Sequence, residues 1–223
     1  MFTIIARMQA KAFLFDLNGT MIDDMHYHIS AWHKILNDLG ANITYEESKA
    51  NCYGKSAELI GRILPGKFTD EEAYQIGFDK EATYREMFRP HLKLMPGLDQ
   101  FLEQAYQAGI QMAIGSAGIM PNLTFVTEGL QIGHYFQTLV SADDVVNSKP
   151  DPETYLICAE RLGVKPSECI VFEDALKGVE SAERAGMPCV VITSIHEAAE
   201  FAGFNNIIRF IQDYEGLYPR QLS

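Results

Sequence analysis

The sequence predicts a doubly wound α/β fold with a mostly parallel sheet and a helical cap domain inserted after the first strand. Short apolar runs alternate with segments of helical period over the second half of the chain. A long stretch of helical patterns alone separates the first apolar run from the others. Alternation of this kind implies right-handed β-α-β crossovers and a sheet covered on both faces. We therefore expect an α/β core of residues 1–22 and 95–223, and a cap with its hinges at residues 23–94.

The expected strands are short apolar runs, of which the third and the last are the weakest. They are KAFLFDL from Lys11, IQMAIGS from Ile110, TLVSA from Thr138, CIVFED from Cys169, PCVVITS from Pro188 and NNIIRFI near residue 207. Helical spacing between them predicts helices at Leu98 to Ala108, Asn122 to Gly129, Pro152 to Leu162 and Ala175 to Ala185. In the cap we expect helices from about Ala31 to Leu39, Lys55 to Leu64 and Asp70 to Phe88.

Composition narrows the class of protein. The 223 residues carry a net charge of -12, which argues against nucleic acid or an anionic membrane as the main partner. An anionic substrate must then be held by a few local cations, a helix N-terminus or a metal. The four cysteines are scattered without metal-ligand spacing, and no apolar run is long enough to be a signal peptide core or to span a bilayer. We expect reduced thiols and a cytoplasmic location; the sequence carries no signal for an oligomeric state.

Side chains that could take part in catalysis or metal binding lie at the ends of the expected strands. The first strand ends in Asp16, the second in Ser116, and the CIVFED strand in Glu173 and Asp174. Lys149 lies in a turn, Ser-Lys-Pro-Asp-Pro, that leads into a helix. Since ligands of open α/β sheets bind at the carboxyl ends of the strands, these groups should gather at one edge. Clustered carboxylates favour a hard divalent cation, and an aspartate beside Mg²⁺ and a lysine can attack phosphorus.

These motifs, in this order, resemble the haloacid dehalogenase superfamily, and most closely its β-phosphoglucomutase-like branch of sugar-phosphate mutases and phosphatases. They are FDLNGT at Phe15, Ser116-Ala117, Lys149-Pro150-Asp151-Pro152 and Phe172-Glu173-Asp174 followed by Gly178. The resemblance implies a Rossmann-like core with a cap and a small phosphorylated metabolite as substrate. It also implies Asp16 as nucleophile, and Mg²⁺ held by Asp16, the main-chain carbonyl of Asn18 and Asp174, with Glu173 close by. The phosphoryl group would be bound by Ser116, Ala117, Lys149 and Thr20.

Asn18 departs from the pattern. Phosphatases and mutases of this family have an aspartate here, which protonates the leaving group and then deprotonates the attacking water. An amide cannot do this, and general acid–base catalysis is typically worth about 10²–10⁴-fold in rate. Three explanations stay open. The chain is a hydrolase with a good leaving group or a proton carrier from the cap, a low-turnover binder of phosphorylated metabolites, or a chain in which Asn18 was introduced to trap a complex.

The cap offers three candidate residues. Lys55, after Gly54, falls where the phosphoglucomutase branch usually has an arginine that binds the substrate phosphate, so it is a candidate phosphate contact. It also lies in a region comparable to that in which phosphonoacetaldehyde hydrolases have a cap lysine that forms a Schiff base. His28 matches a cap-hinge histidine of that branch and is a candidate proton carrier, since the unperturbed pKa of histidine is about 6.5. A mutase is disfavoured because Gly118-Ile119-Met120 has no polar side chain for a second phosphate. We therefore expect a Mg²⁺-dependent phosphohydrolase acting through an aspartyl-phosphate on Asp16, with a mutase, a phosphonoacetaldehyde hydrolase or a binder as alternatives.

Overall fold

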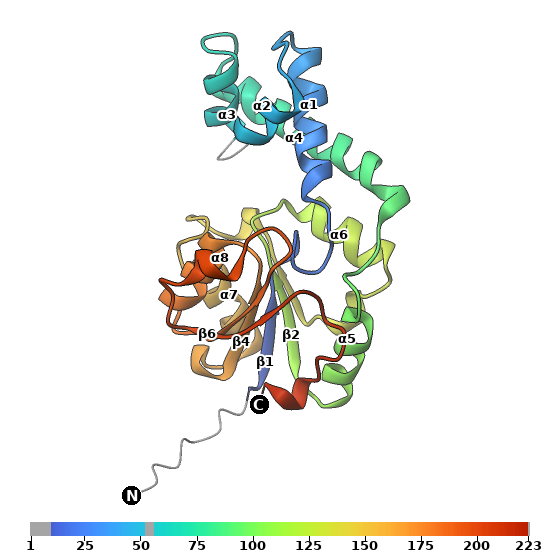
Figure 1. The fold of residues 1–223 in the computed structure, drawn as a ribbon, viewed down its shortest axis with the longest axis vertical. Coiled ribbons are helices and arrows are strands. Elements are labelled where there is room, and N and C mark those ends of the chain that lie inside the picture. The colour runs from blue at the N-terminus through green and yellow to red at the C-terminus, as the bar shows by residue number, and fades with distance from the viewer. Residues whose placement is uncertain (1–9, 52–55, 223) are drawn as a thin grey trace, which may run out of the picture. The chain divides into compact units, whose positions relative to one another are not determined.

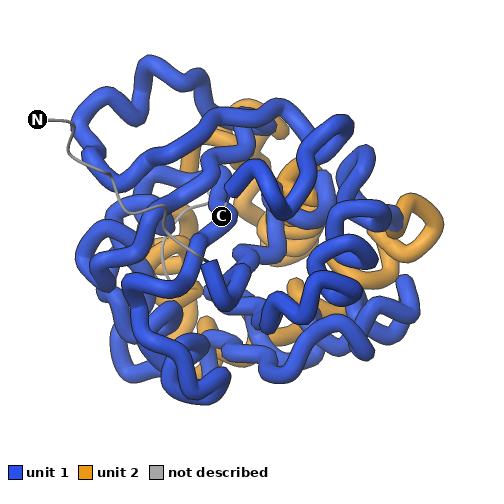
Figure 2. The backbone as a smooth tube through the Cα atoms, turned by 90° about the horizontal axis from the view of Figure 1, so that it is seen from below, with its two compact units in different colours: residues 1–23, 93–223 blue, residues 24–92 orange. Residues whose placement is uncertain are grey.

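The computed structural model describes residues 10–51 and 56–222. The chain divides into two compact units, residues 1–23 with 93–223 and residues 24–92, which are coloured separately in Figure 2. The first unit is an α/β core and the second is helical. Within the described ranges, no helix is long and apolar enough to cross a bilayer.

The core contains one six-stranded parallel sheet with strand order β3-β2-β1-β4-β5-β6 (Figure 1). The strands are β1 (Ala12–Phe15), β2 (Gln111–Gly115), β3 (Thr138–Val140), β4 (Cys169–Glu173), β5 (Cys189–Ile192) and β6 (Ile207–Ile211). Each forms within an apolar run that the sequence analysis identified, including the two weakest. The strand order reverses at β1, as in a doubly wound fold, so the predicted fold class is confirmed.

The core helices are α5 (Leu98–Gln107), α6 (Met120–Gly129), α7 (Glu153–Leu162) and α8 (Leu176–Arg184). Short 3-10 turns of this unit lie at η2 (Gly133–Tyr135), η3 (Ala142–Asp144), η4 (Pro166–Glu168), η5 (Ala198–Phe201) and η6 (Pro219–Gln221), and η1 (Arg89–His91) belongs to the helical unit. The helical predictions for this unit are correct to within two residues at each end. Helix α7 ends at Gly163, whose left-handed backbone (φ +68°) lets the chain turn towards β4.

The two faces of the sheet are buried by different side chains. Ala12 and Leu14 of β1 face one way and belong to a core cluster with residues of α7 and α8. Phe13 and Phe15 face the other way, where their rings contact Phe101 of α5. Because successive residues of a strand point to opposite faces, a fully apolar strand such as β1 must be covered on both sides. This burial fixes the position of the residue that follows the strand.

The cap unit is formed by α1 (Met25–Asp38), α2 (Tyr45–Asn51), α3 (Ser56–Ile63) and α4 (Asp70–Phe88). Helix α4 has the predicted bounds and begins at a Thr69–Glu72 capping box. Helix α1 begins at Met25, six residues before the expected start. Helix α2 was not predicted, because it is polar and lacks an apolar period. The reciprocal hydrogen bonds between Thr44 and Glu47 mark its start, and the sequence Thr-x-x-Glu could have revealed it.

Candidate active site

The candidate site begins with Asp16, the residue after β1. The backbone N–H of Asp16 donates to the carbonyl of Phe172 on β4 at 2.9 Å, and its side chain is largely buried. Phe15 is in register with Ile114 of β2 on one side and with Phe172 on the other. Asp16 therefore lies where the strand order reverses, which is the point at which open α/β sheets bind ligands.

The turn after Asp16 depends on a glycine. Gly19 has φ +77°, a left-handed conformation that favours glycine, and a Cβ at this position would lie 2.1 Å from Oδ2 of Asp174. The missing side chain lets the Asp174 carboxylate approach the turn. The hydroxyl of Thr20, which we predicted to bind phosphate, donates to Oδ1 of Asp174 at 3.1 Å. Thr20 thus helps to orient a carboxylate, and its contact with phosphate stays a prediction.

Lys149 connects the carboxylates at this edge. Its side chain is 7% exposed, and its ammonium lies 2.6 Å from Oδ1 of Asp16 and 2.8 Å from Oε1 of Glu173. It also donates to the hydroxyl of Tyr155 at 2.8 Å and to the carbonyl of Gly115 at 3.0 Å. Burial alone would lower the pKa of Lys149, but the charges of Asp16 and Glu173 outweigh it and raise the pKa. Lys149 is therefore a cation throughout the neutral range.

Glu173 is held from two sides. Its Oε2 accepts the backbone N–H groups of Asp174 and Ala175, both at 2.9 Å, and its Oε1 accepts from Lys149 and Tyr155. The space that its carboxylate fills would be taken by a Cβ at Gly178, which would lie 1.6 Å from Oε1. The glycine in the first turn of α8 is thus needed for the conformation of Glu173.

The charges at this edge are not balanced. Asp16, Glu173 and Asp174 each offer a carboxylate oxygen, and these oxygens all lie within 4.8 Å of one another, whereas Lys149 supplies one positive charge. Burial, and then the charges of Glu173 and Asp16, raise the pKa of Asp174 well above its usual value. A hard divalent cation with oxygen ligands would relieve this repulsion, so the residues present fit Mg²⁺.

Ser116 and Asn18 both lie near the loop that follows β2. The N–H of Ser116 donates to the carbonyl of Val140 at 2.9 Å, and its hydroxyl accepts from the N–H of Gly118 at 3.0 Å. A Cβ at Gly118 would lie 3.3 Å from the Ser116 Oγ and 3.7 Å from the Asn18 Oδ1, so both side chains border this loop. Ala117, in the same loop, is exposed. The core thus brings together the predicted residues Asp16, Asn18, Thr20, Ser116, Ala117, Lys149, Glu173 and Asp174.

In the cap unit, His28 lies in a network of side chains. Its Nδ1 is 2.7 Å from the ammonium of Lys80, which also donates to Glu81 at 2.7 Å, and its Nε2 is 3.4 Å from Asp24. The imidazole stacks on the ring of Tyr84 with centroids 3.7 Å apart. Because an ammonium only donates, Nδ1 accepts, and the ring proton is on Nε2.

The other two cap candidates, Gly54 and Lys55, lie outside the described residues. Cys52 does as well, whereas the thiols of Cys158, Cys169 and Cys189 are free and buried.

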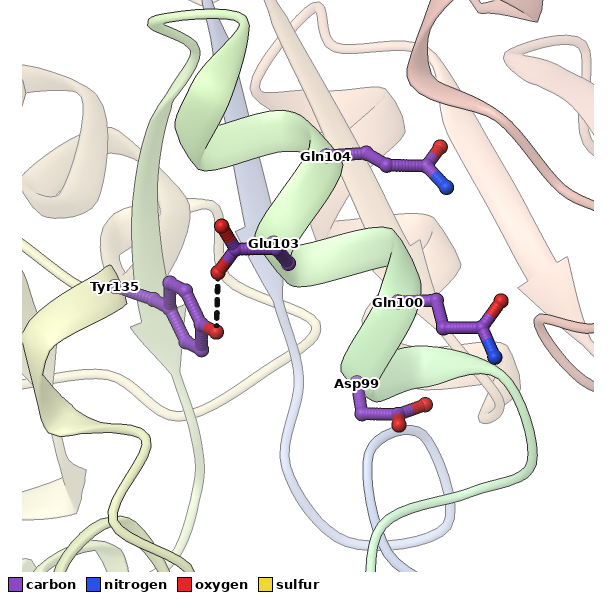
Figure 3. A pocket seen from close by; sticks show the side chains of 5 residues that line it. All are labelled: Asp99, Gln100, Glu103, Gln104 and Tyr135. Carbon is purple, nitrogen blue, oxygen red and sulfur yellow. Dashed lines mark hydrogen bonds between the residues drawn. The ribbon is translucent and has the colours of Figure 1, made fainter.

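A hollow elsewhere in the core unit has different chemistry from the Asp16 site (Figure 3). It is lined by Asp99, Gln100, Glu103 and Gln104 of α5 together with Tyr135, whose hydroxyl donates to Glu103 at 2.8 Å. The carboxylates of Asp99 and Glu103 would repel a phosphate ester, and no lysine or arginine among the described residues lines this hollow to offset them. The Lys149 ammonium, which contacts the residue after β1 and the last residue of β4, is a cation that suits an anionic substrate.

Comparison with known proteins identifies the family. Residues 13–192 match the model of the haloacid dehalogenase-like hydrolases. A hexitol phosphatase of Escherichia coli is 33% identical over 192 residues, which are 84% of this chain and 85% of that protein. A fructose-1-phosphate phosphatase of the same organism is 29% identical over 177 residues, or 79% and 93% of the two chains. The crystal structure of a β-phosphoglucomutase from Clostridium difficile superposes with a TM-score of 0.80 at 26% identity, covering 96% of this chain and 95% of that one. The chain belongs to the haloacid dehalogenase-like hydrolase family.

Proposed function

We propose that the chain is a Mg²⁺-dependent phosphohydrolase that acts on a small phosphorylated carbohydrate or related metabolite through an aspartyl-phosphate on Asp16. The observation that carries this proposal is the Lys149 ammonium, held 2.6 Å from the buried Asp16 carboxylate beside two further carboxylates. Two relatives, one named a fructose-1-phosphate phosphatase and the other a hexitol phosphatase, support the substrate class.

The first step is attack of an Asp16 oxygen on phosphorus, with loss of the leaving-group oxygen. Lys149 and the Ser116 hydroxyl would hold the oxygens of the transferring phosphoryl group. Asp16, Asp174 and the main-chain carbonyl of Asn18 would hold Mg²⁺, which when bound neutralises charge on the phosphoryl group and the carboxylates. In the second step water attacks phosphorus, releasing inorganic phosphate and the Asp16 carboxylate.

Asn18 restricts fast reaction to substrates whose leaving group needs no proton. Its amide cannot give a proton to a departing alkoxide, which costs about 10²–10⁴-fold for a sugar phosphate. A substrate whose leaving group departs unprotonated, such as an acyl phosphate, escapes most of this cost. The contacts of His28 with Lys80, Asp24 and Tyr84 favour a structural role for the imidazole over proton transfer.

A binding protein for phosphorylated metabolites is the second candidate, favoured by Asn18 alone. Phosphate release with and without Mg²⁺ separates the two, measured on hexose and hexitol phosphates, acetyl phosphate, pyrophosphate and phosphonoacetaldehyde. We expect the chain to hydrolyse at least one of them, Asp16→Ala to abolish release, and Asn18→Asp to raise the sugar-phosphate rate about 100-fold or more. If only Asn18→Asp turns over, the chain with Asn18 is a binder.

A further inference from the structure

Tyr155 is a buried residue of the site that the sequence analysis did not select. It lies near the start of α7, its side chain is fully buried, and its hydroxyl lies 2.8 Å from the Lys149 ammonium and 2.9 Å from Oε1 of Glu173. The ammonium is also 4.6 Å from the centroid of its ring. The hydroxyl therefore touches both the cation and the carboxylate that face Asp16.

The direction of these hydrogen bonds follows from the donors available. An ammonium has three protons and accepts none, so the Tyr155 oxygen accepts from Lys149 and its single proton goes to Glu173. Lys149 has four acceptors for three protons: Asp16, Glu173, Tyr155 and Gly115. One proton is therefore shared between two acceptors, so Lys149 can release Asp16 and still direct its protons to Glu173, Tyr155 and Gly115.

Glu173 is saturated in the same network. A carboxylate has about four acceptor positions. Those of Glu173 are taken by two backbone N–H groups, Lys149 and Tyr155. To bind a metal ion, Glu173 would have to lose one of these four hydrogen-bond donors. The arrangement therefore assigns Glu173 to Lys149, and leaves Asp16 and Asp174 as the carboxylates for a cation.

We propose that Tyr155 is a positioning residue for phosphoryl transfer: its hydroxyl fixes the ammonium of Lys149 towards Asp16 and keeps Glu173 engaged with that lysine. This inference rests on the proposed function of the site. When a phosphoryl group is bound, its oxygen competes with Asp16 for a Lys149 proton, and the contacts to Tyr155, Glu173 and Gly115 then determine where the ammonium points. Small misplacements of such a group cost up to about 10²-fold in rate.

The test compares Tyr155→Phe with Tyr214→Phe, a matched control. Tyr214 is 1% exposed in the same unit, and among the described residues its hydroxyl has no hydrogen-bond partner. Calorimetry measures the affinity for Mg²⁺ alone, and for inorganic phosphate at saturating Mg²⁺. Steady-state kinetics with p-nitrophenyl phosphate give kcat and KM.

We expect Tyr155→Phe to weaken phosphate binding and lower kcat by about 10-fold to 100-fold, the usual effect of losing a hydrogen bond to a charged group. The affinity for Mg²⁺ should stay within about twofold. Tyr214→Phe should leave all three quantities near those of the unmodified chain. Equal phosphate affinities for the two variants would overturn the inference, because Tyr155 would then be only a core residue.

A tenfold loss of Mg²⁺ affinity in Tyr155→Phe would also overturn it, since Glu173 would then belong to the metal site. The binding measurements keep this inference separate from the proposed function. A chain that binds phosphate but releases none from any substrate would reject hydrolysis, and the phosphate affinities of the two variants would still decide the role of Tyr155.

Discussion

In the described part of each unit, a lysine is buried among side chains that could titrate, and the surroundings of these two lysines differ. In the core, Lys149 lies within 2.8 Å of the carboxylates of Asp16 and Glu173. In the cap, Lys80 lies 2.7 Å from Glu81 and 2.7 Å from an imidazole nitrogen of His28. Their side chains are 7% and 4% exposed, so burial does not distinguish them.

The difference lies in the balance of charge. The core lysine contacts two carboxylates, and the carboxylate of Asp174 lies beside them. The resulting excess of negative charge favours a divalent cation, which in turn can bind an anion. In the cap, the ammonium lies over the Trp32 ring at 5.5 Å, and the Glu81 side chain is 20% exposed and can be hydrated. A buried lysine thus indicates a reactive site only where its partners leave a charge unsatisfied, and in the cap it stabilises helix packing.

Substituting each lysine should give the largest difference between a lysine of the candidate active site and one that stabilises helix packing. Lys149→Met leaves Asp16 and Glu173 buried without their cation, which we expect to cost about 3–5 kcal/mol in the free energy of unfolding and to abolish phosphate binding. Lys80→Met leaves a carboxylate that water can reach, so we expect about 1–2 kcal/mol and little change in phosphate affinity. Urea denaturation and phosphate calorimetry measure both. Equal losses in the two variants would show that the two sites do not differ in kind.

Magnesium should stabilise the core through Asp174. Because burial, Glu173 and Asp16 raise the pKa of this carboxyl, the folded state binds its proton more tightly than the unfolded state does. Its contribution to stability is therefore present at low pH and is lost as pH rises from about 4 towards the raised pKa. At pH 8, Mg²⁺ at 100 times its Kd should add about 2.7 kcal/mol.

Asp174→Asn is the variant that checks this. It should raise the Tm of the metal-free protein at pH 8 and remove most of the gain on adding Mg²⁺, as thermal denaturation at two pH values would measure. A variant that loses Tm without Mg²⁺, or that keeps the full gain, would contradict the proposed ligand.

Substitutions at two helical glycines should change stability with opposite signs, and the change at Gly61 is the smallest that we expect. Gly178→Ala would place a Cβ 1.6 Å from Oε1 of Glu173, so we expect a loss of about 1–3 kcal/mol from overpacking, together with weaker phosphate binding. Gly61→Ala in α3 meets nothing within 4 Å and should stabilise by up to about 1 kcal/mol. Urea midpoints measure both changes. The same sign for the two substitutions would mean that Glu173 moves away without cost.

The sequence was sufficient to predict those site residues whose position follows from the order and direction of the strands. Asp16, Ser116, Glu173 and Asp174 each follow or end a buried parallel strand, so their meeting at one edge follows from the fold class. Residues placed by the rotation of a helix were harder to predict. The position of Tyr155 in Pro-Glu-Thr-Tyr suits a core residue equally well, and only the packing of α7 turns its hydroxyl towards Lys149.

Helix α2 shows a different limit. Its seven residues are almost all polar, so apolar periodicity cannot reveal it, and its only signal is the capping pair at its start. The same limit applies to Lys80 and His28, which are far apart in sequence and meet through the packing of α1 against α4. Side-chain networks within a helical unit depend on helix rotation, which a single sequence leaves open.

The most direct test of the central claim is to look for the phosphoryl group on Asp16. The protein is mixed with Mg²⁺ and acetyl phosphate, quenched in acid, digested, and analysed by mass spectrometry. Because Asn18 cannot activate water, hydrolysis should be slow enough for the peptide with Asp16 to gain one phosphoryl group. Asp16→Asn should remove that gain, and Asn18→Asp should reduce it while speeding phosphate release. Turnover that persists in Asp16→Asn, or a phosphoryl group on another residue, would contradict the account.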